Sequence, residues 1–164
     1  MRKYFDETFS GDLNSYGGNV PVIRYAEVLL SYLEAKLEAG EGITQTLLDE
    51  TINKVRGRAS VQMPAITEVN AAKLRPILRN ERRVELAMEG IRYWDLLRWG
   101  IAHEALNGDI YGAPFPGSQR TSVKPGGEAD KYGRWWVNSR AFRQDQDYKW
   151  PIPQSEQDIN PNLR

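Results

Sequence analysis

Helical periodicity in this chain of 164 residues ends near residue 100, and this boundary is what most constrains the fold. Before it, apolar residues recur at every third or fourth position, as on one face of a helix. After it, glycine, proline and turn-forming side chains interrupt every pattern of helical length. We therefore expect a mainly α chain, helical over about 21–100 and loop-rich and aromatic over about 101–164, forming a single domain over 1–164.

The helical part contains four segments with an apolar stripe. We expect helices over about 21–39, 44–57, 73–89 and 91–99. Pro21 is placed to start the first helix and Gly40 to end it, while Thr44 is placed to cap the second. Pro76 is expected in the first turn of the third helix, and Gly90 interrupts the pattern before the fourth. The first two helices, joined by a short turn, predict one antiparallel pair of the tetratricopeptide type.

Composition excludes several classes of function. The 22 basic and 22 acidic residues give a formal net charge of zero without a basic cluster, so we expect no nucleic-acid partner. Cysteine is absent and His103 is the one histidine, which excludes disulfides, thiolate nucleophiles and zinc sites built from several histidines. No apolar run approaches the roughly 18 residues of a membrane span. We expect no cofactor and no metal.

Segment 80–100, NERRVELAMEGIRYWDLLRWG, combines four acidic residues with four arginines and a row of apolar residues. On a helix, residues three or four apart are neighbours, so these charges form an alternating row. A solvated face with weak ion pairs is one interpretation. Because every cation is an arginine, whose planar fork suits partly buried pairs, we favour a structural clasp that pins the helices to the C-terminal half. The expected clasp residues are Glu81, Arg82, Glu85, Glu89, Arg92, Asp95 and Arg98.

A catalytic interpretation of the same charges fares worse. Glu85 and Glu89 would have to act as the paired carboxylates of a glycosidase. Such pairs flank a cleft from separate elements, about 5–9.5 Å apart, and one of the two has a raised pKa. Carboxylates on adjacent turns of one helix, interleaved with arginines, would both stay ionised. We therefore expect no catalytic residue and no enzymatic activity.

The charged segment also resembles the hallmark segment of the SusD/RagB family, the surface glycan-binding lipoproteins of Bacteroidetes. Two other regions are similar to that family in the same order: the helix-pair region at 21–40 and 52–59, and YKWPIPQSEQDINPNL at 148–163. Family members are usually much longer, so we interpret the chain as a C-terminal portion. The matching hallmark positions are Glu81, Arg82, Arg83, Glu85, Leu86, Glu89, Gly90, Arg92, Asp95, Leu96, Arg98, Trp99 and Gly100.

This resemblance implies a SusD-like C-terminal domain that binds glycans without hydrolysing them during polysaccharide utilization. The implied ligand is an oligosaccharide or polysaccharide, and the implied partner is a SusC-like TonB-dependent transporter. The implied location is the cell outer membrane, as a surface-exposed lipoprotein held only by a lipid anchor in the missing N-terminal region. The resemblance also implies that the hallmark residues are structural. The alternative is a protein-interaction module built on the helix pair, without sugar binding of its own.

A sugar site needs an aromatic platform beside polar side chains, and residues 134–138 offer one. If this segment is extended, Trp136 shares a face with Arg134 and Asn138, while the intervening side chains, including Val137, face the core. Tyr132 is expected at the edge of the platform. The structural alternative is that the tryptophans hold loops to the core.

Residues 107–111 are a weaker candidate for the same site. Asn107, Asp109 and Tyr111 offer polar and aromatic groups, although Asn107 and Asp109 could equally be turn formers. Aromatic side chains are also expected to hold the irregular half together, since each can bury about 150–250 Å². They are Tyr111, Phe115, Tyr132, Trp135, Trp136, Phe142, Tyr148 and Trp150.

Overall fold

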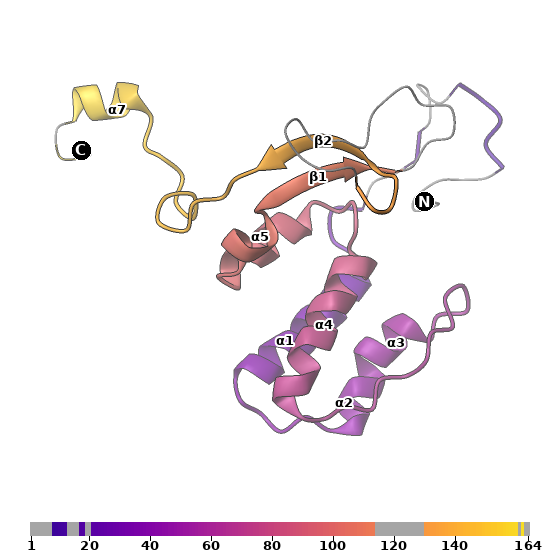
Figure 1. Ribbon diagram of the computed structural model, residues 1–164. Helices are drawn as coiled ribbons and strands as arrows, with labels where there is room; N and C mark the ends of the chain where they lie inside the picture. Colours follow the sequence, from indigo (N-terminus) through magenta and orange to yellow (C-terminus); the bar gives the residue numbers. More distant parts are fainter. Residues whose placement is uncertain (1–7, 13–16, 19–20, 114–129, 161, 163–164) are drawn as a thin grey trace. The chain divides into compact units, whose positions relative to one another are not determined.

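The computed structural model describes residues 8–12, 17–18, 21–113, 130–160 and 162 (Figure 1). Over these residues the chain is mainly helical, as the sequence predicted, and its one sheet has two strands. Contacts group the chain into two compact units, Met1–Glu89 and Gly90–Arg164. No helix among the described residues is both long and apolar enough to span a membrane.

The first unit is a small helical assembly with a continuous apolar core. Its described helices are α1 (Tyr25–Glu38), α2 (Gln45–Glu50), α3 (Ile52–Arg56) and α4 (Ala71–Glu85). Helix α1 packs against α4 and against the α2–α3 arm (Figure 1). The core is made by apolar residues of these helices, and its fully buried members are Leu30, Leu33, Leu48, Ile52, Leu74 and Leu78.

The expected helix over 44–57 is divided into two at Thr51. Thr44 caps α2 as predicted, since its side chain accepts a hydrogen bond from the Leu47 amide at 3.1 Å. Thr51 then leaves the helical region, with φ −120° and ψ −96°, and its hydroxyl donates to the Leu47 carbonyl at 2.5 Å. A threonine that bonds back to the preceding turn bends a helix, which accounts for the division.

The two long helices begin elsewhere than expected. Helix α1 begins at Tyr25 because Arg24 is still extended at φ −119°, so Pro21 lies outside the helix. Helix α4 begins at Ala71, where the Asn70 side chain accepts from the Lys73 amide at 3.2 Å. Pro76 therefore lies inside α4 and not in its first turn.

Helix α4 ends at Glu85, four residues before the expected end at 89. Met88 and Gly90 both have left-handed backbone conformations, with φ of 68° and 77°. Such conformations end a helix, and glycine adopts them far more readily than methionine. The charges of segment 80–100 are therefore carried by a helix, a turn and a second helix, and not by one row.

The second unit combines short helices with a β-ribbon. Its described elements are α5 (Ile91–Arg98), α6 (Ala102–Ala105), β1 (Gly108–Gly112), β2 (Trp135–Arg140) and α7 (Gln154–Ile159). Helix α5 is the short helix that the sequence predicted, whereas α7 lies in a tail that was expected to be extended.

Burial in the second unit is slight. Of its described residues, Asp95, Leu96 and Ala102 are the ones that are buried. Two of the aromatic residues expected to hold this half together are largely exposed: Tyr132 at 63% and Trp150 at 75%. Phe115 lies outside the described residues, and the other expected aromatic residues are partly buried.

Candidate functional site

The β-ribbon contains a β-bulge that sets which side chains share a face. Strands β1 and β2 are antiparallel, with Tyr111 opposite Trp136 and Ile110 opposite Asn138. Val137 is thus the extra residue on β2, and it is 42% exposed where the core was expected. Because directly opposed residues point to the same face, Asn138 lies on the face of Ile110 and not on that of Trp136. The expected alternation over 134–138 is corrected accordingly.

The opposite face of the ribbon gathers five of the residues that the sequence singled out, which we call the ribbon-face cluster: Asp109, Tyr111, Tyr132, Arg134 and Trp136. The Trp136 indole N–H donates to Asp109 Oδ1 at 3.4 Å, and the Tyr111 hydroxyl donates to Asp109 Oδ2 at 3.5 Å. The Arg134 guanidinium carbon lies 4.7 Å from the centre of the Tyr111 ring and 4.9 Å from that of Tyr132. Both distances suit cation–π contacts.

Asp130 fixes the guanidinium of the cluster. Arg134 donates from Nη2 to Asp130 Oδ1 at 2.8 Å and from Nε to Oδ2 at 3.1 Å. The backbone amides of Tyr132 and Arg134 also donate to this carboxylate, each at 3.0 Å. The hydrogen bonds from Arg134, side chain first, and from the Tyr132 amide lower the pKa of Asp130 to about 2. Asp130 and Arg134 therefore form an ion pair without net charge, and Asp130 holds the Arg134 guanidinium between the two tyrosine rings.

Exposure differs among the rings of the cluster. Tyr132 is 63% exposed and offers an open aromatic face. Trp136 is half-buried and its N–H is committed to Asp109, which also accepts a hydrogen bond from the Ser139 hydroxyl. On the other face of the ribbon, the Trp135 indole lies directly over Gly112, where an added Cβ would come within 2.0 Å of the ring. Tyr132, which the sequence placed at the edge of the platform, is thus its most accessible ring.

Asn107 stands apart from the cluster. Its side-chain amide donates to the His103 carbonyl at 2.6 Å and to the Phe142 carbonyl at 3.1 Å. Its oxygen accepts from the Phe142 amide at 2.5 Å. These bonds tie the start of the ribbon to α6 and to the segment after β2. Asn107 is therefore occupied with backbone contacts in the arrangement that the structure shows.

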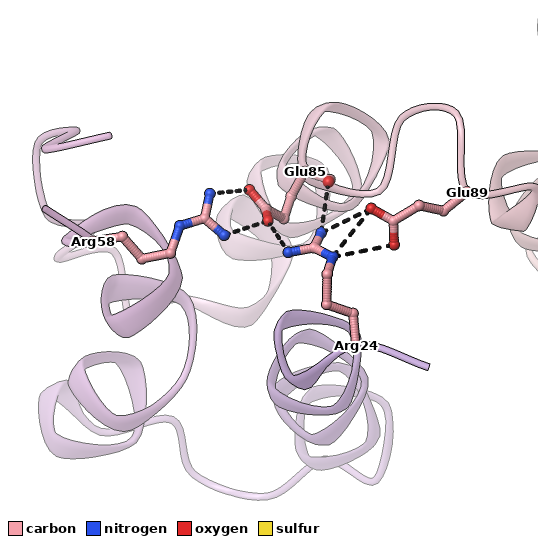
Figure 2. Close-up of polar contacts among 4 residues, drawn as sticks. All are labelled: Arg24, Arg58, Glu85 and Glu89. Carbon is pink, nitrogen blue, oxygen red and sulfur yellow. Dashed lines mark hydrogen bonds and ion pairs between the residues drawn. The ribbon is translucent and has the colours of Figure 1, made fainter. Parts of the chain in front are cut away.

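The two glutamates considered as a catalytic pair lie in a network with Arg24 and Arg58 (Figure 2). Glu85 accepts from Arg24 Nη1 at 2.6 Å and from both terminal nitrogens of Arg58, at 2.5 and 2.9 Å. Arg24 also donates to Glu89 at 2.9 Å and so bridges the two carboxylates. Burial alone would raise the pKa of Glu85, but the hydrogen bonds and charges of Arg58 and Arg24 outweigh burial and lower that pKa.

The neighbouring charges of α4 also reach the helix pair. Glu81 forms an ion pair with Arg56. Arg82 donates to the Ser31 hydroxyl at 2.9 Å and lies 3.5 Å from the Glu34 carboxylate. These contacts of Glu81 and Arg82, like those of Glu85 and Glu89, run to residues 24–58. The expected attachment of the clasp to the C-terminal half stays a prediction.

The three remaining clasp positions, Arg92, Asp95 and Arg98, lie on α5. The Arg98 guanidinium donates to the buried Asp95 carboxylate at 2.7 Å. The guanidinium carbons of Arg92 and Arg98 lie 5.6 and 4.9 Å from the Trp99 ring. Within the second unit, these charges are thus engaged locally, around one turn of helix and the tryptophan that follows it.

The arginines that pair with the hallmark glutamates were not singled out from the sequence. Arg24 hydrogen-bonds across 61 and 65 residues, and Arg58 across 27. No helical spacing reveals pairs at such separations. The available signal was the resemblance itself, because Arg24, Arg56 and Arg58 all lie in the segments similar to the SusD/RagB helix pair.

Metal chemistry has no preformed centre in the described part of the chain. No group of three or more histidine, cysteine, aspartate or glutamate residues among the described positions is arranged to hold a metal ion. The carboxylates of Asp130 and of Figure 2 face arginines, and that of Asp109 accepts hydrogen bonds from Trp136 and Ser139. What these arrangements offer is hydrogen bonding and aromatic contact.

Comparison with known proteins places this chain in one family. The family model of the SusD family matches residues 1–164, and the chain belongs to that family. A solved SusD-like carbohydrate binding protein from Bacteroides fragilis has a TM-score of 0.87 and 62% identity over 100% of the chain. A second SusD-like protein from the same species has a TM-score of 0.60 and 31% identity over 82% of the chain. The SusD/RagB resemblance read from the sequence is thus confirmed.

The chain corresponds to a limited part of these relatives. It covers 32% of the first solved protein and 23% of the second. SusD-like protein P38 of Formosa agariphila is 33% identical over 95 residues, which are 54% of this chain and 18% of P38. SusD-like protein P2 of the same organism is 33% identical over 88 residues, which are 50% of this chain and 17% of P2.

Proposed function

We propose that the chain takes part in non-catalytic glycan binding and that the ribbon-face cluster is its contact surface. The observation that carries this proposal is the Arg134 guanidinium, held by Asp130 between the rings of Tyr111 and Tyr132. A sugar offers a flat C–H face and a rim of hydroxyls. The open Tyr132 ring suits the face, and the fixed guanidinium suits the rim. Groups held in place before binding lose little freedom when the ligand arrives.

The electrostatics of the carboxylates support a binding role over hydrolysis. A glycosidase needs a general acid whose pKa is raised, so that it carries a proton near neutral pH. Asp130 and Glu85 both have lowered pKa values, because arginines donate hydrogen bonds to them. Neither is suited to donate a proton to a leaving group. This argues for a protein that captures glycans and leaves their bonds intact.

We extend the proposal to the full-length protein through membership of the SusD family. It is a surface-exposed lipoprotein of the outer membrane, held by a lipid anchor in its N-terminal region. It works beside a SusC-like TonB-dependent transporter and delivers captured oligosaccharides to it. The solved Bacteroides fragilis relative that shares 62% identity is itself a SusD-like carbohydrate binding protein, which supports the same ligand class here.

We also propose a structural role for the hallmark charges, as a clasp. The network of Figure 2 supports this role, because Arg24 and Arg58 join Glu85 from segments far apart in the sequence. The side chains of Arg24, Glu85 and Glu89 are 21%, 11% and 9% exposed. At that degree of burial an ion pair contributes defined geometry more dependably than it contributes stability.

Calorimetric titration with a panel of plant, host and bacterial oligosaccharides tests the binding proposal. We expect at least one glycan to bind the full-length protein, and Tyr132→Ala to weaken that binding at least about tenfold. The matched control is Tyr25→Ala, which removes an equally exposed tyrosine, 62% exposed, from α1. Equal affinity in the parent and in Tyr132→Ala would remove the ribbon-face cluster as the contact surface. If no glycan in the panel binds the full-length protein, the proposed glycan-binding function is wrong.

A protein-interaction module built on the helix pair is the second candidate function. It is favoured by exposed apolar side chains on and before α1: Val22 at 96%, Ile23 at 71%, Tyr25 at 62%, Tyr32 at 50% and Val28 at 49%. Exposed apolar patches of this kind mark interaction surfaces. If this is the function, the double substitution Tyr25→Ser and Tyr32→Ser abolishes co-purification with the transporter, and no glycan in the panel binds the parent protein. Retained co-purification would exclude this candidate.

A further inference from the structure

A concave feature lies in the second unit and does not involve the ribbon-face cluster. It is a hollow of about 220 Å³ lined by Tyr93, Asp147, Lys149, Trp150 and Pro151. None of these residues belongs to the ribbon-face cluster. Two aromatic rings, a proline ring, a carboxylate and an ammonium group meet here. The volume is below the roughly 300–1,000 Å³ of pockets for drug-sized ligands, which favours a single small ring as occupant.

The turn that carries the hollow is anchored through Tyr148. Its hydroxyl is hydrogen-bonded to His103 Nδ1 at 2.8 Å. Its ring meets Phe142 edge-on, with 5.0 Å between the ring centres, and His103 at 5.9 Å. With Tyr148 turned toward α6, the two residues that follow it are exposed, Trp150 at 75%. Lys149 and Trp150 are thus presented to solvent from a fixed point.

The charge of the hollow is unbalanced in favour of its lysine. Asp147 accepts hydrogen bonds from the Arg143 amide at 2.6 Å and from Arg143 Nη2, also at 2.6 Å, so its charge is compensated. The Lys149 ammonium has no ion-pair partner among the residues that the structure describes. Asp145 belongs to the same turn but does not line the hollow. One positive charge therefore remains for a ligand.

We propose that this hollow binds an acidic sugar unit, with the C–H face of a uronic acid ring on Trp150 and its carboxylate on the Lys149 ammonium. Asp147 accepts from the sugar hydroxyls, and Tyr93 and Pro151 supply the remaining apolar wall. This inference rests on the proposed function and deepens it, because it assigns a preference for acidic over neutral glycans. An ammonium–carboxylate contact supplies the preference, since a charge-assisted hydrogen bond is about twice as strong as a neutral one.

The test compares matched acidic and neutral ligands on the full-length protein. Short oligomers of galacturonic, glucuronic and mannuronic acid are titrated beside their methyl esters, which have the same rings without the charge. We expect at least one acid to bind about tenfold more tightly than its ester. Lys149→Gln is expected to abolish that preference while leaving the affinity for the ester within about threefold. Trp150→Ala is expected to weaken both ligands, because both lose the ring contact.

Salt and a matched lysine complete the design. Raising the salt from about 0.05 to about 0.5 M should weaken acid binding in the parent protein more than in Lys149→Gln, because salt screens exposed charges. Lys73→Gln, an exposed lysine of α4, is the control and should keep the preference.

The outcomes separate this inference from the proposed function. Equal binding of acid and ester, or a preference that survives Lys149→Gln, overturns the acidic-sugar site. If Tyr132→Ala abolishes glycan binding while Trp150→Ala has no effect, the proposed function stands and the second site is rejected. If no oligosaccharide of either charge binds, both are overturned.

Discussion

Glu85 is the residue on which three segments of the first unit converge. It lies at the end of α4 and accepts hydrogen bonds from Arg24, just before α1, and from Arg58, just after α3. Its carboxylate must be ionised to satisfy both guanidinium groups. A neutral amide in its place would leave two partly buried cations short of an acceptor, and unsatisfied charged groups are costly.

We therefore expect Glu85→Gln to lower the free energy of unfolding by about 1–3 kcal/mol. Urea or thermal denaturation monitored by circular dichroism measures this change. Glu50→Gln is the control, because Glu50 is exposed at the end of α2, and surface substitutions of this kind usually stay within about 0.5 kcal/mol. Equal stability of the two variants would contradict the structural role of the network in Figure 2.

Asp130 gives the ribbon a defined response to acid. Its pKa is about 2 in the folded chain against an ordinary value of 3.8, chiefly because Arg134 donates to it. A lowered carboxyl pKa contributes stability that is fully present above the ordinary value and is lost as the pH falls through the folded value. The contacts that hold Arg134 between the two tyrosines should therefore weaken as the pH falls from about 4 to about 2.

Nuclear magnetic resonance can follow this titration at the two amides that donate to Asp130. We expect the signals of Tyr132 and Arg134 to shift with a midpoint near the folded pKa of about 2. Asp130→Asn should remove that step, because an amide does not titrate in this range. A midpoint near 4 in the parent protein would show that Arg134 does not hold the carboxylate in solution.

Most members of the candidate site could be named from the sequence, but their arrangement could not. Tyr111 and Trp136 were singled out separately, and the ribbon places them opposite each other. Asn138 was assigned to the wrong face because the bulge at Val137 shifts the alternation by one residue. A bulge depends on how two strands pair, and no local pattern in this segment announces it.

Helices α1, α4 and α5 are the elements that apolar periodicity located, and Thr44 is a cap that residue type located. Where each element ends was less predictable. The end of α4 depends on Met88, which adopts a left-handed conformation at φ 68° although methionine rarely does so. The division at Thr51 depends on one side-chain bond, to Leu47. Periodicity reports which face is buried, whereas these endings depend on single backbone angles.

The turn between α4 and α5 offers a paired test of these backbone angles. Gly90 has φ 77° and Met88 φ 68°, and the Met88 side chain is 83% exposed. Gly90→Ala should destabilise the fold by about 1 kcal/mol, because a side chain is strained in this conformation. Met88→Gly should leave stability unchanged or raise it by up to about 1 kcal/mol, because it removes that strain at little loss of packing.

Chemical denaturation of the two variants beside the parent protein measures both effects. Gly42→Ala is the control, because Gly42 has an ordinary backbone conformation and open space around its Cβ position. Destabilisation by Met88→Gly as large as that by Gly90→Ala would show that the methionine side chain, and not the backbone angle, is what the turn requires.

At the scale of the whole molecule, burial is distributed unequally between the two units. The first unit has a connected apolar core whose fully buried leucine and isoleucine side chains are Leu30, Leu33, Leu48, Ile52, Leu74 and Leu78. In the described part of the second unit, Leu96 and Ala102 are the buried apolar residues. Local opening is easiest where few apolar contacts hold the backbone. The candidate sugar contacts all lie in that more lightly packed unit.

Hydrogen exchange across the chain tests this distribution and the candidate site in one experiment. Amides of α1 and α4 should exchange at least about tenfold more slowly than those of β1 and β2, because their opening exposes more apolar surface. A bound glycan at 100 times its Kd stabilises the bound form by about 2.7 kcal/mol. Protection should then rise at the ribbon, where the ligand contacts Tyr132 and Arg134, and remain unchanged in α1. A glycan that protects α1 and leaves the ribbon unchanged would move the binding surface to the helix pair.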